Sequence, residues 1–172
     1  AVMSLSDFFL HYGIFMLVAL IVGGFFFWKW ARTPQGQYSL DRVKLSAPFF
    51  GTLFTKLYLS RIADNMNTLL QSAIPIVKTL EITSAVVDNA VYKAILQDTI
   101  DGVKSGTSIS EAMGKHPEVP GIMVQMMKVG EETGELGNIL KTLARFYARE
   151  VTNAVDALVG LIEPAMVILL GL

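Results

Sequence analysis

Cysteine is absent from this sequence of 172 residues, and charged side chains are scarce at 17%. Without cysteine, the sequence can form no disulfide, no thiolate metal site and no cysteine nucleophile. The 14 Lys and Arg residues nearly balance the 15 Asp and Glu residues. Because nucleic-acid binding requires an excess of positive charge on one surface, we expect no nucleic-acid partner.

Motifs of catalysis and cofactor binding are also missing. The sequence has no Gly-x-x-x-x-Gly-Lys-Ser/Thr loop, the pattern that surrounds nucleotide phosphates. Gly130, Gly134 and Gly137 lack the spacing of a dinucleotide fingerprint, and they follow a helical pattern rather than a strand. His11 and His116, the two histidines, have no neighbours at metal-ligand spacing. We therefore predict no enzyme activity, no cofactor and no metal.

Hydrophobic residues make up 52% of the sequence, and one long run contains no charge. The run Phe8–Trp28 has 21 residues, which as a helix would span roughly 31 Å and cross a bilayer core. Lys29 and Arg32 follow the run and Asp7 precedes it, which places the C-terminal side in the cytoplasm. A buried hairpin helix of a soluble protein is the alternative. We assign residues 1–32 to a transmembrane helix and its flanks.

We expect residues 33–50 to form a connector at the membrane surface. Residues 51–157 have the periodicity of six amphipathic helices. No segment shows the alternation of a strand, so the predicted fold class is all-α, with an antiparallel six-helix cytoplasmic bundle. The first helix runs over the apolar positions from Leu53 to Leu70. Proline, glycine and a Ser-x-x-Glu capping box separate the others, which are expected from Pro75, from Ala90 to Lys104, from Ser108, from Pro120 to a joint at Gly130–Gly134, and from Glu135 onward.

The sixth predicted helix continues into an apolar end. Residues 158–172 are interpreted as the start of a second transmembrane helix, although Ala165–Leu172 is too short to complete a crossing. We therefore expect that helix to be truncated. Glu163 and Pro164 mark a candidate kink where the helix meets the membrane, or simply the boundary of the membrane interface.

The run Val129–Leu136 is the most informative local pattern. Its two glycines, Gly130 and Gly134, indicate an unusual backbone angle or a very close approach of helices. Its carboxylates, with Glu135, could bind a divalent cation or a partner. Alternatively they complement the dipole at the start of the sixth helix, which is the interpretation we favour. The candidate structural or partner-contact joint consists of Gly130, Glu131, Glu132, Thr133, Gly134 and Leu136.

Four methionines lie close together in the sequence, at Met113, Met123, Met126 and Met127. Methionine is flexible and polarisable, so a cluster of this kind can form an adaptable docking surface. The helical spacing instead favours a place in the core.

Several of these stretches together resemble the type II secretion system F domain family, and within it the PilC-like inner-membrane platform proteins of type IV pilus machines. The resemblance covers nearly the whole chain. Two residues depart from the family pattern, because Ala73 stands where glycine is usual and Val119 where phenylalanine is frequent. The matching stretches are Leu69–Pro75, Gly106–Ala112, Val124–Met127, Val129–Leu136, Glu150–Leu158 and Glu163–Pro164.

The resemblance implies a fold of two six-helix cytoplasmic domains with three membrane helices, of which this chain resembles the C-terminal half. It further implies a multi-pass protein of the bacterial inner membrane, a platform without enzyme activity. The implied partners are an assembly ATPase, pilin subunits, other inner-membrane components, membrane lipid and further copies of the protein. We expect the long sixth helix to transmit movement of the bundle to the membrane, because a continuous helix is stiff.

A membrane-tethered receptor or signalling bundle is the alternative function. Such modules often signal through a coiled coil and would show sustained heptads. The breaks at Pro75, Gly106, Pro120 and Gly134 argue against heptads. An intramembrane enzyme using His11 and Glu163 would need the two groups to meet, but the predicted topology places them on opposite sides of the membrane.

Overall fold

The structure is a computed structural model that describes residues 22–25, 29, 31–47, 50–160 and 166. These residues form helices and no strand, so the predicted all-α class is confirmed for the described part of the chain. Contacts divide the chain into two compact units, residues 1–40 and residues 41–172, and helix α2 (Pro34–Ser46) crosses that boundary.

The two predicted transmembrane segments lie largely outside the described residues. Only four residues of Phe8–Trp28 are described, and Glu163 and Pro164 are not. Among the helices within the described ranges, none has both the length and the apolar character that a membrane span requires. The membrane arrangement therefore stays a prediction.

Six helices make up the described part of the second unit beyond α2, in agreement with the predicted number. Sequence periodicity also placed their order correctly. The fifth predicted helix ends at Gly134, within the predicted joint. Two predictions are wrong in detail: the first helix of the bundle begins at Phe50 rather than Leu53, and Pro34–Ser46 of the predicted connector is helical. The helices are α3 (Phe50–Gln71), α4 (Ile76–Val86), α5 (Ala90–Lys104), α6 (Ile109–Met113), α7 (Gly121–Thr133) and α8 (Leu136–Gly160).

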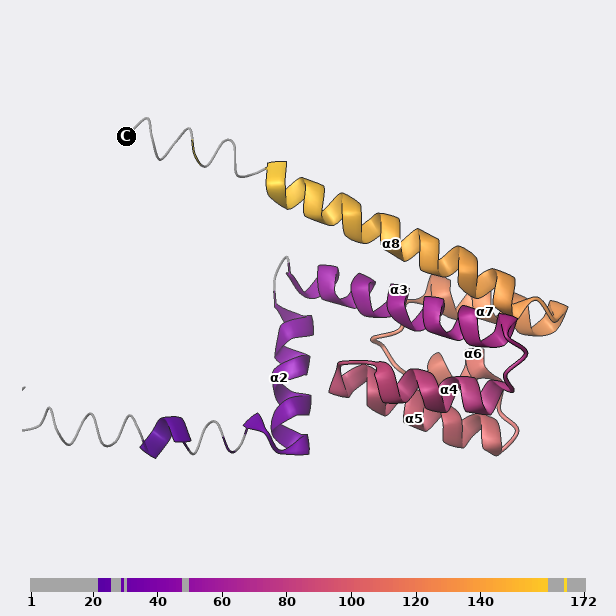
Figure 1. Ribbon diagram of the computed structural model, residues 1–172, viewed down its shortest axis with the longest axis horizontal. Coiled ribbons are helices and arrows are strands. Elements are labelled where there is room, and N and C mark those ends of the chain that lie inside the picture. Colours follow the sequence, from indigo (N-terminus) through magenta and orange to yellow (C-terminus); the bar gives the residue numbers. More distant parts are fainter. Residues whose placement is uncertain (1–21, 26–28, 30, 48–49, 161–165, 167–172) are drawn as a thin grey trace, which may run out of the picture. The chain divides into compact units, whose positions relative to one another are not determined.

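These helices form a closed ring of neighbours. Each helix packs against the next one in the sequence, and α8 returns to pack along α3 (Figure 1). The α3–α8 pair is antiparallel, so the beginning of α3 and the end of α8 lie at the same end of the six-helix body (Figure 1). The first and last helices thus hold the body together over the longest shared length.

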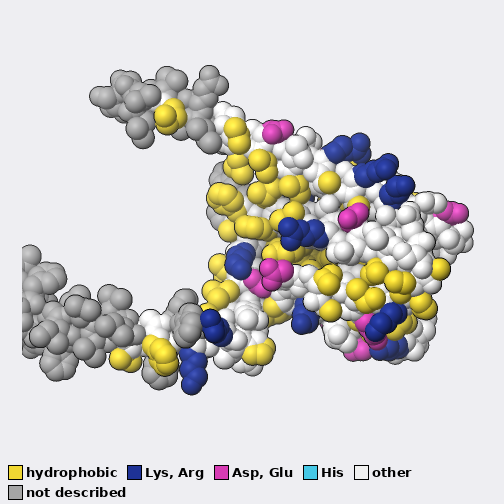
Figure 2. All heavy atoms as spheres, viewed as in Figure 1, with side chains coloured by type: hydrophobic (Ala, Val, Ile, Leu, Met, Phe, Trp, Pro, Cys, Tyr) yellow, Lys and Arg dark blue, Asp and Glu magenta, His cyan; other side chains and the backbone are white. Residues whose placement is uncertain are grey.

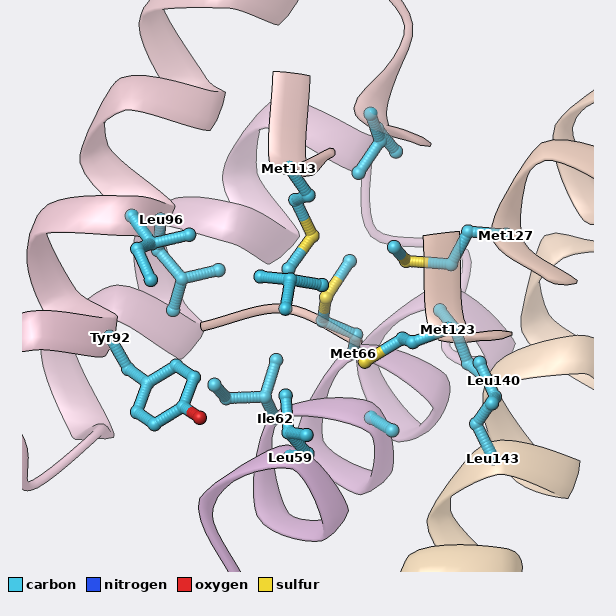
Figure 3. Close-up of a cluster of buried hydrophobic side chains, with 14 of the residues drawn as sticks. Leu59, Ile62, Met66, Tyr92, Leu96, Met113, Met123, Met127, Leu140 and Leu143 are labelled. Atoms are coloured by element: carbon cyan, nitrogen blue, oxygen red, sulfur yellow. The ribbon is translucent and has the colours of Figure 1, made fainter. Parts of the chain in front are cut away.

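The core is formed by large aliphatic, methionine and tyrosine side chains from α3, α4, α5, α6, α7 and α8. Figure 3 shows part of this core, where Ile62 and Met66 of α3 lie close to Met123 of α7. Met113, Met123 and Met127 have no exposed surface, which confirms that these methionines belong to the core rather than to a docking surface. Met126 packs at its edge. The largest fully buried side chains are Leu59, Ile62, Met66, Leu80, Tyr92, Leu96, Ile100, Met113, Met123, Met127, Leu140 and Leu143.

Several helices begin at capping residues or prolines that can be recognised in the sequence. Asn89 precedes α5, and its side-chain oxygen accepts hydrogen bonds from the N–H groups of Val91 and Tyr92 at 3.0 and 3.1 Å. Pro75 and Pro120 lie immediately before the first residues of α4 and α7. This agrees with proline's place at a helix start, where its missing N–H is not needed.

The turn between α3 and α4 contains a strained residue. Ala73 has φ +58°, the only positive φ of a non-glycine residue within the described ranges. Its N–H bonds to the carbonyl of Leu70 at 3.0 Å, and the N–H of Ile74 bonds to that of Leu69 at 3.1 Å. This pairing is the Schellman end of a helix, in which glycine is favoured at the left-handed residue. The geometry explains why alanine is unusual there.

Candidate functional site at the junction of α7 and α8

The joint lies where α7 ends and α8 begins. Gly130, Glu131, Glu132 and Thr133 form the last turn of α7, so this stretch is helical rather than a loop. Gly134 follows with φ +74°, a left-handed conformation that ends the helix. Glycine adopts this angle without strain, whereas a side chain at Gly134 would be disfavoured.

Gly130 has a different role, which is close packing against α8. It is buried, and a Cβ atom at this residue would lie 3.0 Å from the Cα of Leu136 and 3.0 Å from the Cγ1 of Ile139. A Cβ at Gly134, by contrast, would have no atom of the described residues within 4 Å. The two glycines therefore satisfy one expectation each: Gly134 supplies the backbone angle and Gly130 the close approach.

Glu131 connects α7 to the short helix α6. Its carboxylate accepts hydrogen bonds from the backbone N–H groups of Ile109 and Ser110, the latter at 3.1 Å, and also from the Ser110 hydroxyl. These N–H groups belong to the first turn of α6, which has no intrahelical acceptors for them. A negative charge is also favoured at this end of the helix dipole. Glu131 thus caps a helix that lies 21 to 22 residues earlier in the chain.

Of the two hydrogen bonds in the predicted capping box at Ser108–Glu111, one is present. The Ser108 hydroxyl oxygen accepts a hydrogen bond from the N–H of Glu111 at 3.2 Å. Within the described part of the chain, the exposed Glu111 carboxylate makes no return bond to Ser108. The carboxylate of Glu131 instead bonds to the neighbouring N–H groups, so a distant residue completes the cap.

The predicted role of the carboxylates at the start of the sixth helix is therefore wrong for two of the three. Glu131 and Glu132 lie in the last turn of α7, where the dipole disfavours negative charge. Only Glu135 directly precedes α8, and it accepts a hydrogen bond from the Asn138 side chain. Glu132 is exposed and lies 4.0 Å from Lys128.

A groove of about 590 Å³ opens beside the joint. It lies where residues of α3, α4, α5 and α6 meet those of the α7–α8 junction. Its lining combines apolar side chains with the Glu131 carboxylate and the backbone around Gly134. The lining residues are Leu70, Gln71, Ile76, Val103, Thr107, Ser108, Ile109, Gly130, Glu131, Gly134, Glu135, Leu136, Gly137 and Asn138.

The arrangement offers no cluster of ligands for a cation. Among the described residues, no group of three or more His, Asp and Glu side chains is placed to hold a metal ion. The Glu131 carboxylate already accepts several hydrogen bonds, and Thr133 donates its hydroxyl to the carbonyl of Val129 at 2.8 Å. His116 lies 3.6 Å from Asp98, while His11 falls outside the described residues.

The sequence analysis did not predict three further interactions, which are one ion pair and two caps at the start of α5. Lys56 on α3 forms an ion pair with Glu150 on α8 at 2.8 Å, which holds the pKa of the Glu150 carboxyl below its ordinary value. Asp41 accepts a hydrogen bond from the first N–H of α5, that of Ala90, at 2.9 Å. Both join residues far apart in sequence, so no local pattern signals them. The third interaction, the cap that Asn89 forms on α5, could have been predicted, because asparagine before a helical run is a capping signal.

Comparison with known proteins places this chain in a family. Residues 62–172 match the family described as "Type II secretion system (T2SS), protein F", which is more than half of the chain. The chain belongs to the type II secretion system protein F family. This family match includes the joint, the core of the six-helix body from Ile62 onward, and all of α4 to α8.

Curated relatives of this protein F family chain carry two kinds of names. It is 38% identical over 157 residues to the "Type IV pilus assembly protein PilC" of Thermus thermophilus, covering 90% of this chain and 39% of the relative. It is 31% identical over 171 residues to the protein of the same name from Pseudomonas aeruginosa, covering 99% and 46%. It is 28% identical over 163 residues to the "Type II secretion system protein F" of Aeromonas hydrophila, covering 95% and 42%. The chain thus spans less than half the length of each of these relatives.

Proposed function

We propose that this chain is part of an inner-membrane platform protein that assembles type IV pili or the pseudopilus of a type II secretion system. The family match over residues 62–172 is the observation that carries this proposal. The names of the relatives support both kinds of machine. The protein acts through contacts with other proteins rather than by catalysing a reaction.

In this proposal the six-helix body faces the cytoplasm and contacts a hexameric assembly ATPase, while the membrane segments contact pilin subunits and other inner-membrane components. Several copies of the protein associate in the machine. The sequence offers no nucleotide-binding loop of its own, which agrees with an energy source in a partner.

Exposed apolar side chains support a membrane at one end of the body. Phe50, at the start of α3, is 54% exposed, and Val159, near the end of α8, is 57% exposed. Both helix ends lie at the same end of the body, where hydrophobic side chains gather on the surface (Figures 1 and 2). Water disfavours such a surface, and a membrane interface would cover it.

Helix α8 is the element we propose to carry motion. It runs without interruption for 25 residues, roughly 37 Å, from the joint to the apolar end. Gly130 and Gly134 fix how α8 leaves α7, and the Lys56–Glu150 ion pair attaches α8 to α3. A displacement of the six-helix body would therefore move the membrane end of α8 with it.

Co-purification tests the partner assignment. The full-length protein, extracted from its native membrane in mild detergent, is expected to retain both the assembly ATPase and the pilin of the same organism. An unrelated multi-pass inner-membrane protein with the same affinity tag serves as the control. Absence of both partners after chemical cross-linking in intact cells would argue against the platform role.

Cysteine labelling tests the orientation. The sequence contains no cysteine, so Ala85→Cys, at an exposed residue of α4, would introduce a single reactive thiol within it; any cysteine elsewhere in the full-length protein is first replaced by serine. A membrane-impermeant maleimide should label it in inverted membrane vesicles and not in intact spheroplasts. Labelling in intact spheroplasts would place the body outside the cytoplasm and contradict the proposal.

Pilus formation tests the joint. Gly130→Val and Gly134→Val should each impair assembly in cells, the first by steric clash and the second by backbone strain. Gly137→Ala is the matched control, since its Cβ would have ordinary contact at 3.9 Å with Leu70. Normal pili in both valine variants, at normal protein levels, would show that the joint is not needed.

A further inference from the structure

A second cleft lies between α8 and α3. Its volume is about 390 Å³, and it is separate from the groove at the α7–α8 junction. Ser60 joins its two walls by donating a hydrogen bond to the carbonyl of Ala144 at 3.1 Å. The cleft is lined by Ser60, Arg61, Asp64, Asn67, Lys141, Ala144, Arg145 and Ala148.

Three cations of this cleft have no anionic partner. Arg61, Lys141 and Arg145 are exposed, and no carboxylate of the described residues lies within 4.0 Å of their charged groups. Arg149 follows one helical turn after Arg145, so the positive charge continues along α8. Figure 2 shows Lys and Arg side chains in a row along the outer edge of this helix.

We infer that this cleft binds an acidic peptide segment of a partner protein. Carboxylates of the segment would pair with Arg61, Lys141 and Arg145, which line the cleft and are exposed to it. Three cations against the one carboxylate of Asp64 leave a net charge of +2 in the cleft.

The surroundings favour a peptide over a nucleic acid. Among the residues that the structure describes, no aromatic side chain lines the cleft, so bases would find no ring on which to stack. Asp64 would repel a continuous phosphate backbone, whereas a peptide can place its few carboxylates away from it. The inference uses only contacts of α3 and α8, so it stands independently of the pilus proposal.

Fluorescence anisotropy with a fluorescein-labelled peptide of ten glutamates tests the inference on the detergent-solubilised full-length protein. Arg145→Glu should weaken binding about tenfold or more, and Asp64→Asn should strengthen it about threefold. Lys93→Glu is the matched control, because it makes the same charge change at an exposed residue of α5, and it should leave binding unchanged. Equal weakening by Lys93→Glu would reduce the effect to net charge and overturn the inference.

One further measurement separates a peptide site from general attraction of polyanions. An oligothymidylate of ten nucleotides should bind at least tenfold more weakly than the peptide. Equal or tighter binding of the oligothymidylate would contradict a peptide site.

Discussion

The carboxylate of Glu131 bonds to both the backbone N–H and the hydroxyl of Ser110, which ties the last turn of α7 to the first turn of α6. One residue before it, Gly130 brings α7 into close contact with α8. The joint therefore fixes three consecutive helices with two adjacent residues. Glu131 caps α6 and Gly130 allows close packing against α8, and both roles depend on how α6, α7 and α8 pack together.

Glu131→Ala should lower the free energy of unfolding by about 2 kcal/mol, because it removes charge-assisted hydrogen bonds and leaves N–H groups of α6 without acceptors. Chemical denaturation of the detergent-solubilised chain measures the change. Glu132→Ala is the control, since the exposed Glu132 has only a 4.0 Å contact with Lys128, and it should change stability by less than about 0.5 kcal/mol. Equal effects of the two substitutions would mean that Glu131 does not cap α6.

Gly130→Ala should destabilise the chain by about 1 to 3 kcal/mol, because the added methyl group would be 3.0 Å from the backbone of Leu136. Gly134→Ala should cost about 1 kcal/mol through its left-handed backbone, with no steric clash. Thermal unfolding of the two variants beside Gly137→Ala distinguishes these cases. A Gly130→Ala variant as stable as Gly137→Ala would show that α7 and α8 can separate at no cost.

Ala73→Gly should raise the stability by about 1 kcal/mol, because glycine adopts φ +58° without the strain that alanine pays. The effect should appear as a higher midpoint in urea with an unchanged slope. Ala94→Gly, at an exposed residue inside α5, is the opposite control and should lower the midpoint, since glycine weakens a helix interior. A lower midpoint for Ala73→Gly would indicate that the turn does not need the left-handed angle.

Tyr147 makes stability depend on pH in the alkaline range. Its hydroxyl is buried and has no hydrogen-bond partner among the described residues, and burial raises the pKa of Tyr147 to about 12. Because the folded state disfavours the phenolate, the stability it contributes is complete below the ordinary pKa of about 10 and is lost as pH rises towards 12. Burial raises the pKa of Tyr92 to about 12 as well, so both residues contribute to this loss.

Tyr147→Phe should therefore be as stable as the parent at pH 8, or more stable by up to about 1 kcal/mol, because it removes an unpaired buried hydroxyl. Its advantage should grow by about 1.4 kcal/mol for each pH unit above 10. Denaturation at pH 8, 10 and 11 measures the difference. An advantage that stays constant over this range would show that Tyr147 ionises freely in the folded chain.

Helical periodicity and capping residues were sufficient to predict the local structure of the body. The apolar spacing of α3, the prolines before α4 and α7, and Gly106 after α5 all act on residues within a few positions of each other, and such signals survive in a single sequence. The capping residue Ser108 likewise predicted the start of α6 correctly. The placement of Met123 and Met127 in the core also followed from spacing alone.

What the sequence by itself determined is the all-α class, the number and order of helices α3 to α8, and the glycine and carboxylate content of the joint. Tertiary structure decided what those residues contact. Glu131 reaches α6, Lys56 reaches Glu150 across 94 residues, and Asn67 and Arg145 share a cleft only because α8 returns along α3. The physical reason is that hydrogen bonds and ion pairs depend on distance in space, whereas sequence periodicity specifies only which face of a helix is buried.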